Sequence, residues 1–556
     1  MDRELKKVLI LYLILVIIKI LFSLLITGPS VFGDEYGYEK LGWSLYNNQE
    51  YSIHNIQVNA PMPLYPIILS LTYIFQNAGL IYFFMKLLNI LILSFTAIPL
   101  YYLARKFLEK RDSLIITSII MITPIMFNTN FYLMAENLFY PLFILYIYFF
   151  YESFTKNSSK NSMISGILLG LLFLTRIVSG FIVPVFFITY IFYRKKLKFK
   201  NLITHYLISL MIVIPWFVRN GLNYGFTIKG LFGQYSPVIT EIASSGSIFL
   251  PFINWFVLYL AYLILSTGVI FSIYYALSYK IEDQNYKLLL FISSISILFL
   301  IICAANESAS LRIFYDTPFK LFTRRPIGRY LDPAILLILL NGFIAYTKLN
   351  ISKKLFLKIS IIFSIILLIG TQLIIAPLLP FNNQSLSLFG VASYSFHSLI
   401  GIAQETFSWI IFILFAIIFL ILGLVYNIDF FKKRAVMFTI IFLITSTILA
   451  FSATAKVSYD WNNSEQMKLG KYIGENYSGK ILIDIDNCGE KISKDDYLIL
   501  CDMPRKNTII GFWTNSDITI DKIENIKNYD YLITTKKLDY KIIKDIKGKL
   551  FFYKIT

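Results

Sequence analysis

Three acidic residues in this sequence are placed where they could move protons in catalysis. Asp34 and Glu35 follow a long apolar run, 8–27, and Glu136 begins another, 136–153. A carboxylate in such a place can take the proton from an attacking hydroxyl group. A simpler interpretation stays open for all three residues, since acids are also favoured at helix N-termini as caps and by the helix dipole.

Several arginines stand at the ends of apolar runs, where positive charge is unusual. Arg176 separates two short runs, Arg219 ends another, and the group Arg324, Arg325 and Arg329 precedes a fourth. A charged residue flanked by apolar runs is costly and is usually retained for function. Guanidinium groups bind phosphate through two parallel hydrogen bonds. Anchoring at the membrane surface remains the alternative for any one of these arginines.

Together, the acids and arginines match what transfer from a membrane-bound phosphate ester requires. A carboxylate would deprotonate the attacking hydroxyl group, and arginines would hold the phosphate leaving group. The lipid part of such a donor enters sideways from the bilayer, so that a pocket for a soluble nucleotide is not needed. The sequence accordingly has no P-loop and no glycine-rich dinucleotide motif.

The composition shows which elements must position these residues. The 556 residues are 57% apolar and only 15% charged, with a mean hydropathy of +0.66. Soluble domains are about 45–50% apolar and about 25% charged, so that this composition excludes a soluble enzyme or a disordered protein. Long apolar runs such as 8–27 reach the length of about 18 residues that marks a membrane-spanning helix. We therefore expect an all-α polytopic membrane domain.

The hydropathy pattern predicts about thirteen spans. These are 8–27, 79–104, 113–131, 136–153, 163–175, 177–193, 201–218, 251–279, 287–305, 331–347, 355–376, 408–426 and 435–452. Alternate connections are rich in lysine and arginine, as at 105–111, 194–200, 348–354 and 432–434. Because positive connections stay in the cytoplasm, the N-terminus is expected inside and the C-terminus outside. The same connections account for the net charge of +18, and nucleic acid is not an expected partner.

The outer side is expected to carry two further structures. In the first outer connection, 28–78, residues 34–47 are predicted to form a helix lying in the membrane surface. A second apolar stretch, 64–76, is expected to dip into the interface without spanning. The chain should therefore divide into a transmembrane domain, 1–452, and a small outer α/β domain, 453–556.

Within the tail, helical patterns near 464–477 and 519–528 alternate with apolar stretches that predict strands. The predicted strands are 480–485, 498–501, 508–513, 531–534 and 550–555. A disulfide between Cys488 and Cys501 and a pair of free thiols both remain open.

The order of five features along the chain resembles the GT-C glycosyltransferases, in the branch of the protein O-mannosyltransferases and the lipid A aminoarabinose transferase. The resemblance covers 1–350 well and 350–452 by topology only. Its features are Asp34-Glu35 soon after the first span, Pro63-Leu64-Tyr65-Pro66, Glu136, Pro215-Trp216, and Arg329-Tyr330-Leu331-Asp332-Pro333.

The resemblance implies a sugar transfer on the outer face of the membrane. The donor would be a polyprenyl-phosphate-linked sugar, and the acceptor a lipid, a glycan or a protein. Carried over residue by residue, Asp34 becomes the general base, Glu35 its partner and Glu136 the second acid. Arg329 and Tyr330 become the basic and aromatic pair near the donor phosphate. We add Arg176 and Arg219 to this phosphate site as predictions from their positions.

One motif departs from the aminoarabinose branch. That branch has a Glu-Lys pair before its Pro-Pro, whereas Asn59-Ala60-Pro61 stands here, so that a phosphate lysine and one metal ligand are missing. No cofactor is certain. A divalent metal is possible if His54 joins Asp34 or Glu136, and the alternative for His54 is a solvated loop residue.

Two other classes of function stay open. A transporter or flippase of lipid-linked glycans would place its charged residues deep within spans and would show paired repeats. A scaffold or receptor would use the tail to bind a partner. Here the charged residues gather at one face and no repeat is visible, which favours the enzyme.

Overall fold

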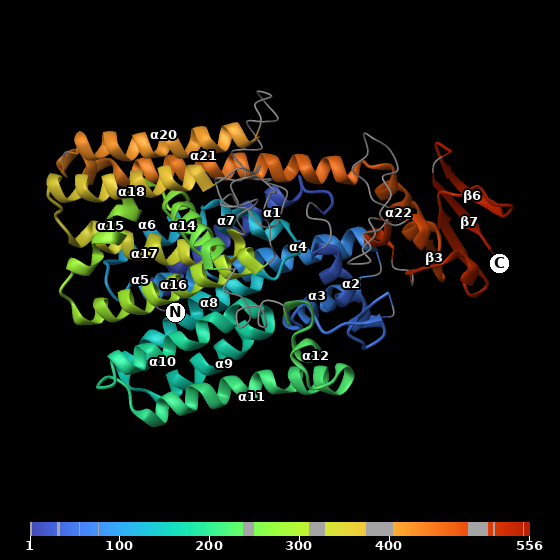
Figure 1. The fold of residues 1–556 in the computed structure, drawn as a ribbon, viewed down its shortest axis with the longest axis horizontal. Coiled ribbons are helices and arrows are strands. Elements are labelled where there is room, and N and C mark those ends of the chain that lie inside the picture. The colour runs from blue at the N-terminus through green and yellow to red at the C-terminus, as the bar shows by residue number, and fades with distance from the viewer. Residues whose placement is uncertain are drawn as a thin grey trace. The chain divides into compact units, whose positions relative to one another are not determined.

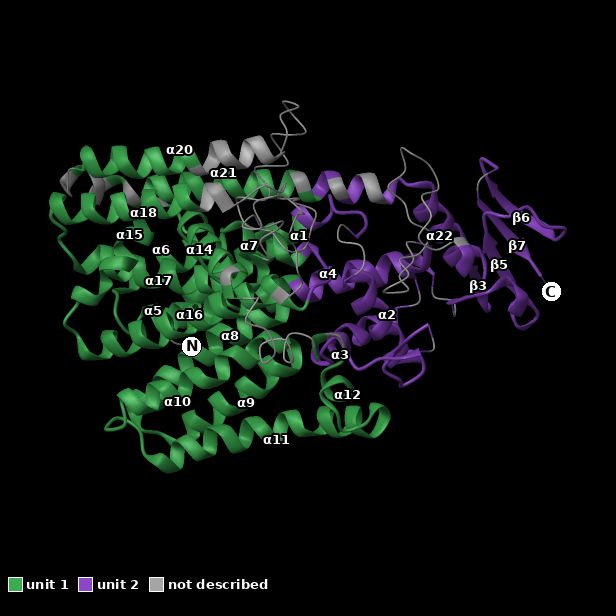
Figure 2. Cartoon of the chain, in the orientation of Figure 1, with its two compact units in different colours: residues 1–21, 90–130, 135–454 green, residues 22–89, 131–134, 455–556 purple. Residues whose placement is uncertain are grey.

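The computed structural model describes the chain except for residues 1–2, 30–33, 55, 76, 237–248, 311–327, 374–403, 427, 488–509, 515–517, 549 and 556. The chain divides into two compact units (Figure 2). Unit 1 comprises residues 1–21, 90–130 and 135–454, and unit 2 comprises residues 22–89, 131–134 and 455–556. Cys488 and Cys501 lie outside the described residues.

Unit 1 is helical throughout its described part (Figure 1). The α-helices that lie wholly or mostly in unit 1 are α1 (Arg3–Ser23), α5 (Ala97–Ala104), α6 (Lys110–Met121), α7 (Pro124–Asn128), α8 (Glu136–Lys156), α9 (Ser159–Thr175), α10 (Val183–Phe192), α11 (Phe199–Tyr224), α12 (Ile228–Phe232), α14 (Phe249–Ser266), α15 (Val269–Leu277), α16 (Gln284–Ser310), α17 (Asp332–Lys348), α18 (Lys353–Leu373), α20 (Gln404–Leu424) and α21 (Ile428–Asn462). Short 3-10 helices join them: η2 (Thr129–Phe131), η3 (Ile177–Ile182), η4 (Gly233–Tyr235), η6 (Ser278–Lys280) and η7 (Gly328–Tyr330).

Small residues allow neighbouring helices of unit 1 to approach closely. A methyl group at Gly166 of α9 would run into the carbonyl group of His205 on α11, and one at Gly170 would run into the side chain of Ile212. Such spacing of small residues is typical of helices that pack within a membrane, where the hydrophobic effect does not drive association.

Among the described residues, five helices are long and apolar enough to cross a membrane, or up to seven if each bent pair is one span. The predicted spans 113–131 and 251–279 are bent pairs, with angles of 67° and 117°. The breaks have local causes, since Thr123 caps α7 ahead of Pro124, and Gly268 adopts a φ of +72° between α14 and α15. The polytopic helical fold is therefore confirmed, while the number of thirteen spans stays a prediction.

Unit 2 combines the long connection after α1 with the tail. The connection contains α2 (Asp34–Asn47), β1 (Ser52–Ile53), β2 (Ile56–Gln57), α3 (Leu64–Ser70), η1 (Leu71–Ile74) and most of α4 (Ala78–Ser94). The helix predicted at 34–47 is confirmed with both of its ends. The apolar stretch at 64–76 is helical over Leu64–Ile74, which is shorter than a membrane span.

The tail holds α22 (Glu465–Asn476), η8 (Ile485–Asn487), η9 (Ile510–Trp513), η10 (Ile523–Asn528) and a five-stranded sheet. Its strands are β3 (Ile481–Asp484), β4 (Ile518–Asp521), β5 (Tyr531–Thr534), β6 (Lys541–Ile546) and β7 (Leu550–Lys554), in the order β4-β3-β5-β7-β6. β3 pairs in parallel with β4 and β5, and β7 pairs antiparallel with β5 and β6. The predicted α/β tail is confirmed.

Two predictions for the tail are wrong, one of them only in part. The helix predicted at 519–528 begins as strand β4, because Ile518 and Ile520 are buried in alternation and pair with β3, and its second half is the 3-10 helix η10. The strand predicted at 508–513 is the 3-10 helix η9 in its described part, and η9 packs on two glycines of α22, Gly470 and Gly474. The strand predicted at 498–501 lies outside the described residues.

Candidate active site

Glu136 is the carboxylate that joins two of the predicted arginines in unit 1. It begins α8, where the helix dipole favours a negative charge. Its Oε1 atom forms an ion pair with Nη1 of Arg176 and lies 3.8 Å from Nε of Arg329. The three side chains are 3%, 9% and 16% exposed, so that little water screens their charges.

Both arginines lie beside the end of a helix. α9 ends at Thr175, Arg176 is extended with φ −151° and ψ 133°, and η3 begins at Ile177. The guanidinium group of Arg176 lies 5.1 Å from the centre of the Tyr330 ring, within the range of a cation–π contact. Arg329 and Tyr330 form the end of η7, just before α17. The structure thus brings together Glu136, Arg176, Arg329 and Tyr330, while the roles assigned to them from the sequence stay predictions.

Two acids near these arginines were missed as site residues. Glu307, near the end of α16, lies close enough to interact electrostatically with both arginines. Asp332, the first residue of α17, is fully buried and accepts a hydrogen bond of 2.7 Å from the hydroxyl group of Tyr140. Both had a signal in the sequence, since Asp332 lies in the motif that begins at Arg329, and Glu307 stands two residues after the predicted span 287–305.

We name the five charged residues of this site the arginine centre: Glu136, Arg176, Glu307, Arg329 and Asp332. It holds two guanidinium groups and three carboxyl groups. Because Glu136 is ion-paired with both guanidinium groups, an incoming phosphate would compete with this carboxylate for their charge. The arrangement can therefore bind a phosphate by exchanging one anion for another.

Arg219 has different surroundings on α11. Its Nη1 atom donates a hydrogen bond of 2.9 Å to Oδ1 of Asn220, and its guanidinium group lies over the Trp216 ring at 5.1 Å. Its predicted role at the phosphate stays a prediction.

Asp34 and Glu35 occupy the first turn of α2 in unit 2, and their environments differ. Glu35 is fully buried, and its Oε1 atom accepts a hydrogen bond of 2.8 Å from the backbone N–H of Leu133. Asp34 is only partly buried. A base must reach a proton on an incoming acceptor, and so this contrast favours Asp34 over Glu35.

Residues of α4 line the surroundings of Glu35 and were missed as well. Lys86 interacts electrostatically with Glu35, and its Nζ atom donates to the backbone carbonyl groups of Ser23 and Ile26 at 2.7 and 2.5 Å. Asn89 donates to the carbonyl group of Tyr132 at 3.0 Å. A signal existed, because polar side chains three residues apart on an apolar helix lie on one face.

The described residues do not fit a metal site that uses His54. They contain no group of three His, Cys, Asp or Glu side chains placed to hold a metal ion. The Nδ1 atom of His54 lies 2.6 Å from the carbonyl oxygen of Ile518, and Nε2 lies 3.1 Å from the hydroxyl group of Tyr36. Both ring nitrogens are thus engaged in hydrogen bonds, and we derive no step through a metal.

Comparison with known proteins gives one family and one fold. Residues 59–218 match the family described as dolichyl-phosphate-mannose-protein mannosyltransferase. The structure is similar to ArnT from Cupriavidus metallidurans bound to undecaprenyl phosphate, with a TM-score of 0.59 and 12% identity over 98% of this chain and 97% of that chain. The apo state of ArnT gives a TM-score of 0.53 and 11% identity over the same shares.

No curated protein matches the chain by sequence. At the identities found, the structural similarity establishes the fold. The resemblance predicted from the sequence is therefore confirmed: the chain is a membrane protein with the GT-C-type fold of ArnT, and its residues 59–218 carry the sequence pattern of the mannosyltransferase family.

Proposed function

We propose that this protein is a glycosyltransferase that moves a sugar from a polyprenyl-phosphate donor to a lipid, glycan or protein acceptor on the outer face of the membrane. The observation that carries the proposal is the pairing of Glu136 with two arginines, the buried Arg176 and the partly buried Arg329. Two guanidinium groups beside a tyrosine ring suit an anionic phosphodiester better than they suit a neutral ligand. The similarity to ArnT, which was solved with undecaprenyl phosphate, supports a donor of this class.

In the proposed reaction the acceptor oxygen attacks the anomeric carbon of the donor sugar. Asp34 takes the proton of the acceptor hydroxyl group as the new carbon–oxygen bond forms. The bond between the anomeric carbon and the phosphate oxygen breaks, and polyprenyl phosphate leaves with the electron pair. Direct displacement inverts the configuration at the anomeric carbon and forms no sugar–enzyme intermediate.

The arginine centre would act on the leaving group in this reaction. As the sugar departs, negative charge grows on the phosphate oxygens, and preorganised guanidinium groups stabilise that charge. Exclusion of water strengthens these contacts and protects the donor from hydrolysis. Tyr330 would hold the guanidinium group of Arg176 in position through its ring.

The proposal is tested by deleting the gene and measuring the surface glycans by mass spectrometry. We expect one sugar to be missing from a glycan, lipid or protein of the deletion strain, and the lipid-linked donor to accumulate. The intact chain should restore the sugar. A deletion strain with unchanged glycans would contradict the proposal, and unmodified glycans retained on the inner side would instead indicate a flippase.

Glu136→Gln gives a first specific prediction. Without the carboxylate charge, the two guanidinium groups no longer have to exchange a bound anion for the donor phosphate. We expect purified Glu136→Gln to bind undecaprenyl phosphate about fivefold more tightly, which corresponds to one net hydrogen bond of about 1 kcal/mol. Its sugar transfer should nevertheless fall, if Glu136 has the catalytic role that the resemblance implies.

The matched control is Glu152→Gln, which neutralises another buried acid of α8 that pairs with Lys106 and Lys156. It should leave the affinity for undecaprenyl phosphate unchanged. Weaker binding by Glu136→Gln would show that this carboxylate serves to hold the arginines in place and does not compete with the phosphate.

A further inference from the structure

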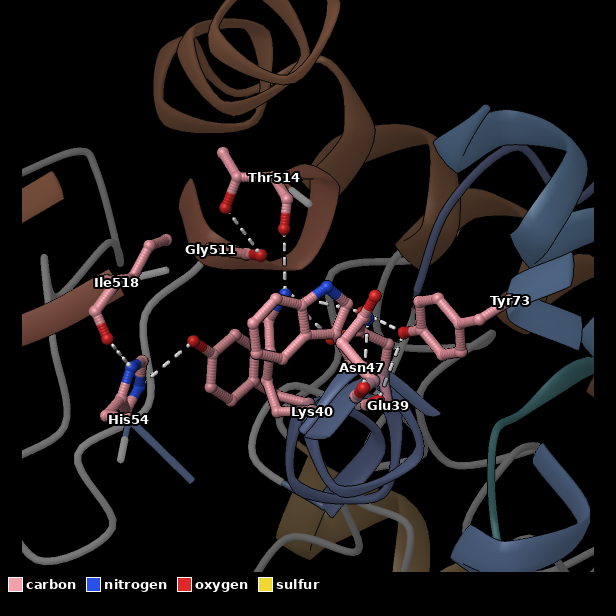
Figure 3. A network of polar contacts seen from close by, with 10 residues as sticks. Glu39, Lys40, Asn47, His54, Tyr73, Gly511, Thr514 and Ile518 are labelled. Atoms are coloured by element: carbon pink, nitrogen blue, oxygen red, sulfur yellow. Dashed lines mark hydrogen bonds and ion pairs between the residues drawn. The ribbon is translucent and has the colours of Figure 1, made fainter. Parts of the chain in front are cut away.

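A buried polar network in unit 2 connects α2 with the tail (Figure 3). Its members from the first connection are Tyr36, Glu39, Lys40, His54 and Tyr73, and its members from the tail are the carbonyl groups of Thr514 and Ile518. α2 also carries Asp34 and Glu35 in its first turn. The network therefore bears on how these acids are held.

Glu39 and Lys40 form a charged pair away from water. The Nζ atom of Lys40 lies 3.3 Å from Oε2 of Glu39, and the two side chains are 8% and 6% exposed. The hydroxyl group of Tyr73 donates to Oε1 of Glu39 at 2.5 Å, and Lys40 donates to the carbonyl group of Thr514 at 3.0 Å. A continuous series of contacts thus runs from η1 through α2 to the tail.

Burial works against the charges of this pair. Desolvation raises the pKa of Glu39 and lowers the pKa of Lys40, although their mutual attraction acts in the opposite direction. Replacing such a pair by apolar residues is often neutral or stabilising. Overall stability therefore does not explain why these two buried positions carry charged side chains. Their directed contacts instead fix one arrangement of the elements.

His54 makes the second connection from an unusual backbone conformation. It lies between β1 and β2 with a φ of +52°, a conformation in which Asn, Asp and Gly predominate in tight hairpins. Its imidazole ring offers one nitrogen that donates a hydrogen bond and one that accepts a hydrogen bond. A carbonyl oxygen only accepts, so that Nδ1 carries the proton and donates to Ile518, and Nε2 accepts from Tyr36.

These contacts run along one side of α2. Residues three and four apart on a helix are neighbours, so that the four side chains form one continuous stripe, made of Glu35, Tyr36, Glu39 and Lys40. They contact four separate groups, which are the N–H of Leu133, His54, Tyr73 and the carbonyl group of Thr514. Contacts to four separate segments oppose rotation of α2 about its axis, and they thereby set the direction of Asp34.

The part of the tail that receives Lys40 is itself firmly placed. η9 packs on α22 where Gly470 and Gly474 leave no room for a side chain, since an added methyl group would meet the carbonyl oxygens of Ile510 and Trp513. η9 also places Phe512 and Trp513 against the Tyr82 ring of α4, at 5.8 and 5.7 Å. A shift of η9 would therefore move Thr514 and disturb its hydrogen bond with Lys40.

We propose that the tail is a positioning part of the catalytic apparatus, and that Lys40 and His54 are the residues through which it fixes the orientation of α2 and Asp34. The inference rests on the proposed function, because it assigns the tail to the same reaction. Lys40 and His54 are positioning residues, which touch neither donor nor acceptor but determine where the base points.

The test uses the full chain, returned to the deletion strain and also purified. Lys40→Met removes the donor to Thr514 and keeps the apolar stem. Gly474→Ala displaces η9 from α22 without touching α2. We expect each to lower the sugar product by about ten- to a hundredfold, because a displacement of about 1 Å can cost 10²-fold in rate. Affinity for undecaprenyl phosphate, measured on the same purified protein, should stay at the wild-type level.

The amount of sugar product is divided by the number of protein molecules that bind undecaprenyl phosphate. A variant that is only less stable then shows no loss of product per binding molecule. Lys40→Arg keeps a donor and should restore most of the product, and Lys527→Met, at an exposed lysine of the tail, should change neither readout. If Lys40→Met does not accumulate, the double variant Glu39→Gln/Lys40→Met is used, because it also removes the acid that has lost its partner. Gly474→Ala tests the positioning role independently of both.

The outcomes separate the two proposals. If the wild-type chain does not restore a sugar to the deletion strain, the proposed function fails and the positioning role with it. If the wild-type chain restores the sugar, and both Lys40→Met and Gly474→Ala yield wild-type product per binding molecule, the positioning role alone is overturned.

Discussion

Replacing Asp34 by Asn should lower the rate of sugar transfer by about 10²–10⁴-fold, the usual contribution of a general base. The amide is nearly the same size as the carboxylate and should preserve the start of α2, but it cannot accept the proton of the acceptor hydroxyl group. The rate is measured on purified protein with the donor identified from the deletion strain. Binding of undecaprenyl phosphate should be unchanged, because the loss is in the chemical step.

Glu50→Gln is the control for this substitution, since Glu50 is an exposed acid in the same connection. It should transfer sugar at the wild-type rate. Near-normal transfer by Asp34→Asn would refute the assignment, and Glu35 or Glu136 would then be the next candidate for the base. Both are buried and engaged, Glu35 with the N–H of Leu133 and Glu136 with the two arginines.

Arg329→Lys should lower transfer by about 10²–10³-fold, as does the loss of one preorganised donor to a developing negative charge. Lysine keeps the charge, but its single ammonium group cannot reproduce the planar, two-pronged contact of a guanidinium group with phosphate. We expect both weaker binding of undecaprenyl phosphate and slower transfer, since Arg329 would contact the phosphate before and during the reaction.

Arg434→Lys provides the comparison, because Arg434 is an exposed arginine at the start of α21 that lies over the Phe430 ring. It should alter neither binding nor transfer. Wild-type affinity and rate in Arg329→Lys would show that the phosphate is bound elsewhere, and Arg219 would become the first alternative to examine.

Local sequence patterns were sufficient where one segment determines its own structure. The helix at 34–47 follows from its acidic first turn and its apolar spacing, and β3, β5 and β7 follow from their apolar runs. β4 was misassigned, because Ile518–Asp521 becomes a strand only by pairing with β3. Such pairing depends on a distant partner, which a local pattern does not reveal.

The arginine centre shows a similar limit. Glu136, Arg176 and Arg329 could be chosen as charged residues beside apolar runs, and Glu307 stands in such a place too, two residues after the predicted span 287–305. Position beside an apolar run does not reveal which charged residues meet in space. The link between α2 and the tail was not foreseeable, because its acceptors are the backbone carbonyl groups of Thr514 and Ile518. Every residue type has a backbone carbonyl group, and so the sequence does not indicate which of these groups will accept a side-chain hydrogen bond.

The contact between Lys40 and Thr514 joins residues 474 positions apart, which has a consequence for how the protein is made. A ribosome that adds about 5–20 residues per second needs roughly half a minute or more to pass from one to the other. During that interval α2 has been synthesised, but the carbonyl groups that Lys40 and His54 bind do not yet exist. Nascent chains would therefore be inserted in the bilayer well before they could transfer sugar, and activity would arise only after Thr514 and Ile518 have been synthesised.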